Sequence, residues 1–273
     1  MPGWGKVDEL WEEDKEKEKK SKYRFTTSER TLDLYDGEIQ YVDDLIREIL
    51  DVLKRTKIIN KTVVVITSDH GEQLGQHGMY GHGASPHESL IFVPLIFWQP
   101  NIFPQGKRIK GLVQHVDTMA SILDIMGITK KPKLDGNSLL PVIEGRKKAR
   151  DKIVIEQTIE YEQERAILED GWKYIRRLNG KEQLYNIKND PVEAINLKDK
   201  EKEKCREMKR ELEQWVYDNI GYSPDPMIEA MKMAYEASRK KGYIPMFNLR
   251  WDSGRCYYWV TVWKRLRQET QNI

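Results

Sequence analysis

The chain has 273 residues, enough for one large or two small domains with a buried core. Its 46 Lys and Arg residues nearly balance 44 Asp and Glu residues, and the formal charge is only +2. This balance argues against a dedicated nucleic-acid-binding protein, which needs surplus basic charge to contact phosphates. The longest apolar run, between Leu90 and Trp98, is far shorter than the roughly 18 to 20 residues that cross a bilayer. We therefore predict no nucleic-acid partner and no membrane span.

The amino-terminal region and the cysteines bear on the cellular compartment. Residues 1–30 are dominated by charged side chains and lack the apolar centre of a secretory signal, so we expect a charged N-terminal arm there. Cys205 and Cys256 lie far apart, in no spacing typical of a metal or redox site. These features predict a cytoplasmic protein without a disulfide framework.

Apolar patterns predict alternating helices and strands up to about residue 130. Side chains spaced by three and four predict an amphipathic helix from Thr31 to about Lys57. Residues 62–67 are apolar and β-branched, which is typical of a strand covered on both faces. The segment SLIFVPLIFW, interrupted by Pro94, predicts a second buried strand, and residues 115–127 predict a helix that ends at a glycine. This order is typical of an α/β sheet.

The pattern changes after about residue 150. Short β-prone runs separated by Glu-Asp-Gly and Asn-Gly predict antiparallel strands, and residues 199–217 predict an amphipathic helix. The end of the chain is rich in aromatic residues and contains a strand-like segment. Beyond the arm, we therefore predict an α/β domain over 31–150, a small antiparallel β-sheet plus helix subdomain over 151–220, and an aromatic-rich tail over 221–273.

Asp69 and His70 directly follow the apolar segment 62–67. Ligands of open α/β sheets bind where strands end, because the connecting loops meet there. A carboxylate beside an imidazole offers oxygen and nitrogen ligands for a divalent ion, and Gly71 allows the backbone a close approach. The alternative is structural, since Asp at the end of a strand is also a common helix cap.

The next twenty residues contain an unusual density of polar groups. Four of the five histidines lie between positions 70 and 87, and the stretch 70–88 is rich in glycine and also holds two glutamates. This composition favours a metal or oxyanion site, and the alternative is a surface loop with solvated histidines. The histidines and glutamates that follow His70 in this stretch are Glu72, His77, His82, His87 and Glu88.

Six blocks of sequence resemble, in order, the C-terminal half of sulfatases of the alkaline-phosphatase-like superfamily. They are LYDGEIQYVDD, VVVITSDHGEQLGQHGMYGHG, VPLIFWQP, HVDTMASILDIMGI, LDGNSLLPVI and QLYNIKNDPVEAINL, within residues 31–217. The resemblance implies part of an alkaline-phosphatase-like α/β sheet flanked by helices. It also implies metal-dependent hydrolysis of sulfuric esters, with a sulfate or phosphate ester as substrate.

The resemblance also implies roles for individual residues. Asp69 and His70 match a pair of metal ligands in the family. His82 matches a position where Lys or His contacts the sulfate or the leaving-group oxygen, which gives it a substrate-binding and catalytic role. Glu88 and His77 match residues that orient or pack the loop. One divalent ion is implied: the family pattern suits Ca²⁺, whereas the imidazole of His70 favours Mn²⁺, Zn²⁺ or Mg²⁺.

The nucleophile of such sulfatases lies in a Cys/Ser-x-Pro-x-Arg segment. Neither Cys205 nor Cys256 begins this pattern, and no Ser does, so the formylglycine nucleophile is not encoded in this chain. Our first hypothesis is a partial sulfatase that needs a second chain or a missing N-terminal half. One alternative is a non-catalytic module with the sulfatase fold that binds a partner or an anionic ligand. Another is a relative of phosphodiesterases and phosphonate monoester hydrolases, which share the Asp-His-Gly block.

Overall fold

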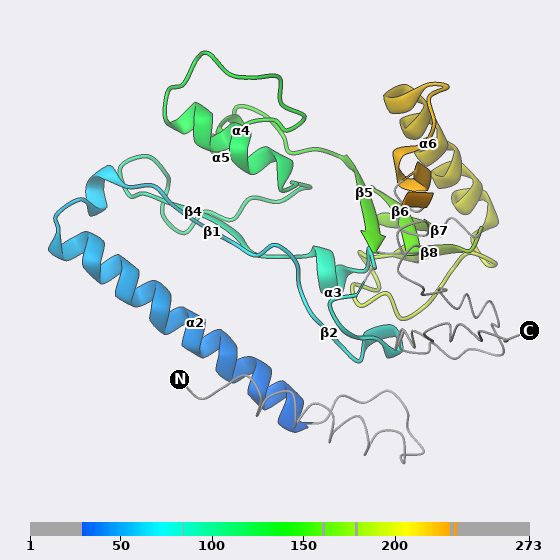
Figure 1. Cartoon of the computed structure of the whole chain (residues 1–273), viewed down its shortest axis with the longest axis horizontal. Coiled ribbons are helices and arrows are strands. Elements are labelled where there is room, and N and C mark those ends of the chain that lie inside the picture. The colour runs from blue at the N-terminus through cyan, green and yellow to red at the C-terminus, as the bar shows by residue number, and fades with distance from the viewer. Residues whose placement is uncertain (1–28, 84, 160–161, 178–179, 230–231, 234–273) are drawn as a thin grey trace, which may run out of the picture. The chain divides into compact units, whose positions relative to one another are not determined.

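The computed structural model describes residues 29–83, 85–159, 162–177, 180–229 and 232–233 (Figure 1). The predicted charged arm and most of the predicted aromatic tail lie outside these residues. Contacts divide the chain into two units, the first running to Leu95 and the second comprising mainly residues 96–225. The domain boundaries expected from the sequence stay predictions.

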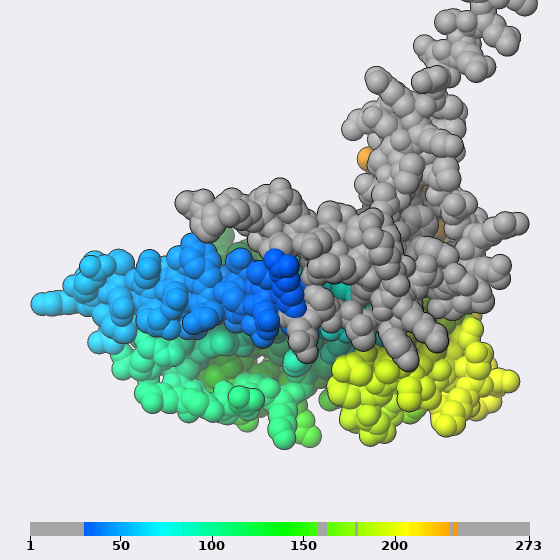
Figure 2. Space-filling model, turned by 90° about the horizontal axis from the view of Figure 1, so that it is seen from below, coloured from blue at the N-terminus to red at the C-terminus, as the bar shows by residue number. Residues whose placement is uncertain are grey.

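The first unit begins with helix α2 (Glu29–Arg55), which confirms the helix predicted from apolar spacing. Ion pairs such as Arg47 with Asp43, at 3.0 Å, lie on its exposed surface. Apolar side chains of the helix are also exposed, including Ile39 at 54% and Ile49 at 60%. Figure 2 shows part of this open surface in blue. The helix therefore owes little of its stability to the described core.

Short elements follow α2 in the first unit. The 3₁₀ helix η1 (Ile59–Lys61) leads into strand β1 (Val64–Thr67), which confirms the strand expected over 62–67. The expectation that this strand is covered on both faces is wrong, because its side chains are half-buried and Thr67 is exposed. A β-branched apolar segment favours a strand by itself, whereas its burial depends on neighbours that its composition does not specify.

The segment around Pro94 also differs from the prediction. Its first part is a short helix, α3 (Glu88–Ile91), and only its second part is a strand, β4 (Leu95–Trp98). The His87 carbonyl accepts hydrogen bonds from the N–H groups of Leu90 and Ile91, which closes the helical turn. Proline lacks an N–H and disfavours helix in the residue before it, so Pro94 separates the two elements.

In the second unit, helix α4 (Val116–Ile125) confirms the helix predicted over 115–127, and α5 (Leu140–Ile143) follows it. Asp117 is fully buried at the start of α4. Its carboxylate accepts the N–H groups of Gln114 at 2.9 Å and Asn137 at 2.8 Å, and it also pairs with Arg150. These bonds connect the start of α4 to the segments on both sides of α5.

The remaining strands form a four-stranded sheet in the order β5-β6-β7-β8. Within this sheet β6 pairs antiparallel with β7, and β7 with β8, as the turn signals predicted. The helix predicted over 199–217 is α6. The strand and helix bounds are β5 Lys152–Ile159, β6 Glu162–Glu169, β7 Trp172–Arg177, β8 Glu182–Asn186 and α6 Lys202–Ile220.

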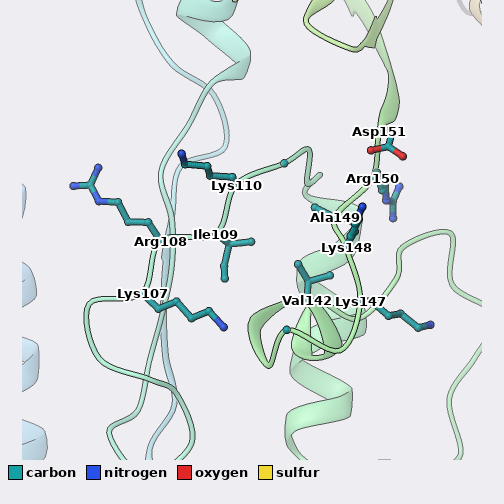
Figure 3. A pocket seen from close by; sticks show the side chains of 12 residues that line it. Lys107, Arg108, Ile109, Lys110, Val142, Lys147, Lys148, Ala149, Arg150 and Asp151 are labelled. Carbon is teal, nitrogen blue, oxygen red and sulfur yellow. The ribbon is translucent and has the colours of Figure 1, made fainter.

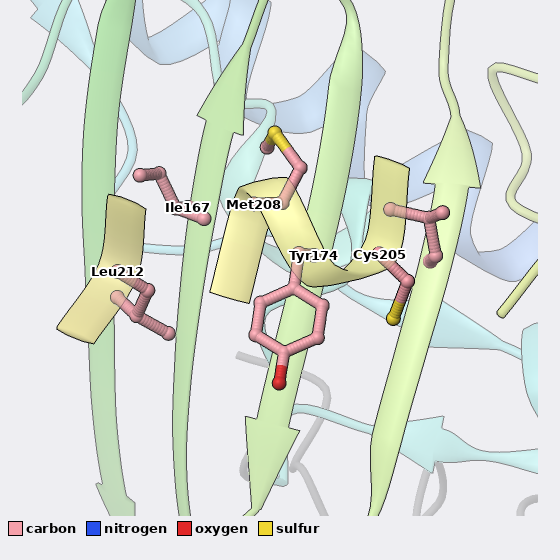
Figure 4. Packing of buried hydrophobic residues seen from close by; sticks show 6 residues of the cluster. Ile167, Tyr174, Cys205, Met208 and Leu212 are labelled. Atoms are coloured by element: carbon pink, nitrogen blue, oxygen red, sulfur yellow. The ribbon is translucent and has the colours of Figure 1, made fainter. Parts of the chain in front are cut away.

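Helix α6 packs on one face of this sheet and forms the main described core (Figure 4). Tyr174 of β7 is fully buried between the sheet and the helix, and its hydroxyl donates a 2.7 Å hydrogen bond to Glu182. Among the described residues, every helix is too short or too polar to cross a membrane. The core residues are Ile167, Tyr174, Leu184, Cys205, Met208 and Leu212.

Candidate metal centre

A small hairpin follows the end of β1. Strand β2 (Gln73–Leu74) pairs antiparallel with β3 (Tyr80–Gly81), and the 3₁₀ helix η2 (Gln76–Gly78) lies in the turn. The register joins residue 73 to 81 and residue 74 to 80. Extending that register by one residue places Glu72 opposite His82. The left-handed φ of 103° at Gly75 suits glycine and helps the chain reverse direction.

Three potential metal ligands converge at the open end of this hairpin. Nδ1 of His82 lies 3.0 Å from Oε2 of Glu72. The ring of His70 stacks on the ring of His82, with centroids 4.7 Å apart and planes at 23°. One ligand atom from each of the three residues lies within 4.8 Å of the other two. Two imidazoles and a carboxylate are therefore close enough to share one ion. While Glu72 is bonded to Nδ1 of His82, the ligands left for an ion are those of His70 and the neighbouring Asp69.

His70 is oriented by its neighbours in the chain. Its Nδ1 lies 2.8 Å from the Gly71 carbonyl oxygen, and a proton on Nδ1 would leave Nε2 free to accept a metal ion. Asp69 lies beside it, with Oδ2 3.7 Å from the His70 Nε2. The backbone N–H of His70, and then the charge of its imidazole, lower the pKa of the Asp69 carboxyl. Asp69 is thus ionised at neutral pH and available as an oxygen ligand.

Gly71 connects this ligand pair to the loop that carries Glu88. Its N–H donates a 2.8 Å hydrogen bond to the Leu90 carbonyl. A Cβ atom at position 71 would lie only 2.1 Å from the Ser89 carbonyl oxygen. The backbone of α3 therefore lies against the residue that follows His70. Glu88 lies in the first turn of α3. Its proposed role in orienting the loop stays a prediction.

His77 lies in the turn of the hairpin with a left-handed φ of 56°. Its ring stacks on that of His87, with centroids 3.8 Å apart and planes at 16°. His87 is 2% exposed, and its N–H donates to the Ser85 hydroxyl at 3.3 Å. The stacking joins the hairpin turn to the segment before α3. The predicted loop-packing role of His77 stays a prediction.

The donor set agrees with a divalent ion that accepts both nitrogen and oxygen. The sequence predicted Asp69 and His70 as ligands, and the structure groups His70 with Glu72 and His82, whose side chains are 24% and 64% exposed. Asp69 lies beside His70 but outside this group, and its role as a ligand stays a prediction. Mixed imidazole and carboxylate ligands suit Mn²⁺ or Zn²⁺, whereas Ca²⁺ prefers oxygen alone. Sequence reasoning gave Glu72 no specific role, although Gly75 and Gly78 signalled a turn between it and His82.

Comparisons with family models and with known proteins identify the family of this chain. Residues 8–128 match the sulfatase family model, and residues 75–218 match the model described as N-sulphoglucosamine sulphohydrolase, C-terminal. The chain belongs to the sulfatase family of the alkaline-phosphatase-like superfamily. This sulfatase-family chain is 32% identical over 168 residues to the choline-sulfatase of Rhizobium meliloti (strain 1021). The aligned region covers 60% of this chain and 32% of the choline-sulfatase.

Solved structures share the fold. One protein, determined in complex with its substrate D-glucosamine-2-N,6-O-disulfate, superposes with a TM-score of 0.62 at 25% identity, over 69% of this chain and 40% of that protein. The phosphonate monoester hydrolase of Agrobacterium radiobacter superposes with a TM-score of 0.59 at 23% identity, over 66% of this chain and 40% of that protein. The predicted partial alkaline-phosphatase-like fold is confirmed. The chain spans between 32% and 40% of the length of these three proteins.

Proposed function

We propose that this chain provides the metal-binding and leaving-group-binding part of a hydrolase that acts on sulfate esters. The observation that carries the proposal is the convergence of His70, Glu72 and His82, next to Asp69, in a chain of the sulfatase family. The solved relative with a disulfated glucosamine supports a sulfated substrate.

Each of the four residues has a role in the proposal. Asp69 and His70 would hold the divalent ion through a carboxylate oxygen and Nε2. When bound, such an ion supplies positive charge near the non-bridging oxygens of the ester. Glu72 accepts a hydrogen bond from Nδ1–H of His82 and keeps the ring in one orientation. As an imidazolium, His82 contacts the ester oxygens through its Nε2–H, or gives that proton to the departing oxygen and becomes a neutral imidazole that is still bonded to Glu72 through Nδ1–H.

The test measures binding of an aryl sulfate to the purified chain by calorimetry, with Mn²⁺, with Ca²⁺ and with EDTA. We expect ester binding only when an ion is present, and no binding in Asp69→Ala. His82→Ala should keep the ion and lose affinity for the ester. Ester binding of equal strength in EDTA would contradict the proposal.

Turnover separates this proposal from a non-catalytic binding module. Because the nucleophile segment is not encoded in this chain, we expect little hydrolysis of the aryl sulfate by the chain alone. An added protein that supplies the segment should restore hydrolysis, and Asp69→Ala should abolish it again. Restored hydrolysis that is unaffected by Asp69→Ala would contradict the assigned role.

A second candidate function is hydrolysis of phosphate or phosphonate esters. The fold shared with a phosphonate monoester hydrolase supports it, and sulfate and phosphate esters are both tetrahedral oxyanions. An aryl phosphate in the same calorimetric experiment distinguishes the two. Tighter ion-dependent binding of the aryl phosphate than of the aryl sulfate would favour this second function.

A further inference from the structure

The second unit contains a hollow of about 450 Å³ between two segments, 107–111 and 142–151 (Figure 3). Its lining is strongly basic, with six basic side chains and a single carboxylate, that of Asp151. The whole chain carries a formal charge of only +2, so this hollow concentrates positive charge. The basic lining residues are Lys107, Arg108, Lys110, Lys147, Lys148 and Arg150.

The two walls of the hollow are connected to each other through backbone contacts. The Leu112 N–H donates a 3.3 Å hydrogen bond to the Arg150 carbonyl in an antiparallel bridge. Gly111 has a φ of 121°, and a Cβ there would lie 2.4 Å from the Cβ of Ala149, so the two backbones pack closely. The Lys107 ammonium also donates to the Ile143 carbonyl across the hollow. The hollow is therefore a built feature of this unit.

Two of the six cations have partners, since Lys107 makes the bond above and Arg150 contacts Gln114 and the buried Asp117. The other four are exposed. In the part of the chain that the structure describes, no side-chain hydrogen bond or ion pair involves Arg108, Lys110, Lys147 or Lys148. Like charges held together in this way repel one another, and an anionic ligand relieves that repulsion.

The directions of the side chains favour an extended ligand over a single anion. Figure 3 shows Arg108 and Lys147 reaching outward on opposite sides, while Lys148 lies between them. A single sulfate ion contacts only one or two of these groups, whereas a chain with several anionic groups contacts them in succession. Clusters of Lys and Arg are typical of sites for such polyanions.

We propose that this basic hollow binds a segment of a polysulfated polysaccharide. The lining contains no aromatic ring, so it lacks the stacking surfaces with which proteins bind single-stranded nucleic acids. The choice of sulfated polysaccharide among polyanions rests on the proposed function. The binding itself needs neither the metal ion nor hydrolysis, because the hollow has its own charged groups.

The experiment measures binding of a heparin-derived hexasaccharide to the full chain in EDTA at several salt concentrations. The test variant is Lys110→Ala/Lys148→Ala. The matched control is Lys200→Ala/Lys202→Ala, which removes two exposed lysines of the same unit that also have no side-chain partner among the described residues. We expect about a tenfold loss of affinity in the test variant, a salt slope lower by about 2, and less than about a twofold loss in the control.

Two further measurements distinguish a specific site from general attraction between opposite charges. Lys110→Arg/Lys148→Arg should bind like the wild type, because it keeps both charges. A single-stranded DNA of equal charge should bind more weakly than the hexasaccharide, and inorganic sulfate should compete only at far higher concentration. The proposal is overturned if the wild type does not bind the hexasaccharide, if test and control variants lose equally, or if the DNA binds as tightly. EDTA removes the ion-dependent ester site, so failure here and failure of the proposed function are distinguishable.

Discussion

Replacing Gly71 by alanine tests how the ligand pair is held in place. The new Cβ would lie 2.1 Å from the Ser89 carbonyl oxygen and 3.3 Å from the Leu90 Cα, both in the backbone of α3. Such overpacking costs about 1–3 kcal/mol. The backbone must move apart, which also weakens the 2.8 Å hydrogen bond from Gly71 to Leu90, worth about 0.5–1.5 kcal/mol. We therefore expect Gly71→Ala to lower the free energy of unfolding by about 1.5–4.5 kcal/mol.

Urea denaturation, followed by circular dichroism, measures this free energy. Gly37→Ala is the matched control, because a Cβ at this position in α2 would meet no atom within 4 Å. Alanine favours helix over glycine, so the control should gain about 0.5–1 kcal/mol. An unfolding free energy of Gly71→Ala within about 0.5 kcal/mol of the wild type would refute the reasoning.

Two further predictions concern the second unit. Met208→Ala, which opens a cavity beneath α6, should lose about 2–5 kcal/mol of stability in urea denaturation, whereas Met126→Ala, at a side chain 67% exposed, should change it by less than about 0.5 kcal/mol. Burial opposes ionisation of Glu182, but hydrogen bonds from Lys209 and Tyr174 prevail and lower its pKa. The ionised Glu182 therefore stabilises the folded chain above its unfolded pKa of about 4.3, and this stabilisation is lost as the pH falls through the lower folded pKa. Glu182→Gln should therefore flatten the acid side of a plot of unfolding free energy against pH. An unchanged acid side of this plot in Glu182→Gln would contradict this assignment.

Local patterns in the sequence predicted most elements correctly. Apolar side chains at helical spacing gave α2, α4 and α6 within a few residues, and turn signals gave the antiparallel sheet of β5 to β8. The prediction of a single strand over residues 89–98 was wrong because an apolar run fits a buried strand and a buried helix equally well. Pro94 marked the break, but the helical turn before it depends on hydrogen bonds to the His87 carbonyl.

The candidate site was predictable in part. Asp69 and His70 could be found from their place after a strand, and His82 from a family resemblance. Placing Glu72 beside His82 required the register of the β2–β3 hairpin. That register depends on the left-handed conformations of the turn and not on composition alone. The metal, the ester and the cytoplasmic location stay predictions.

The central claim is that Asp69 and His70 bind a divalent ion together. A Mn²⁺ titration of the full chain, followed by electron paramagnetic resonance, tests it most directly. We expect one bound ion per chain, loss of binding in Asp69→Ala and in His70→Ala, and unchanged binding in Asp36→Ala, a control at an exposed position of α2. Binding of Mn²⁺ that is the same in all four proteins, or no binding by the wild type, would contradict it.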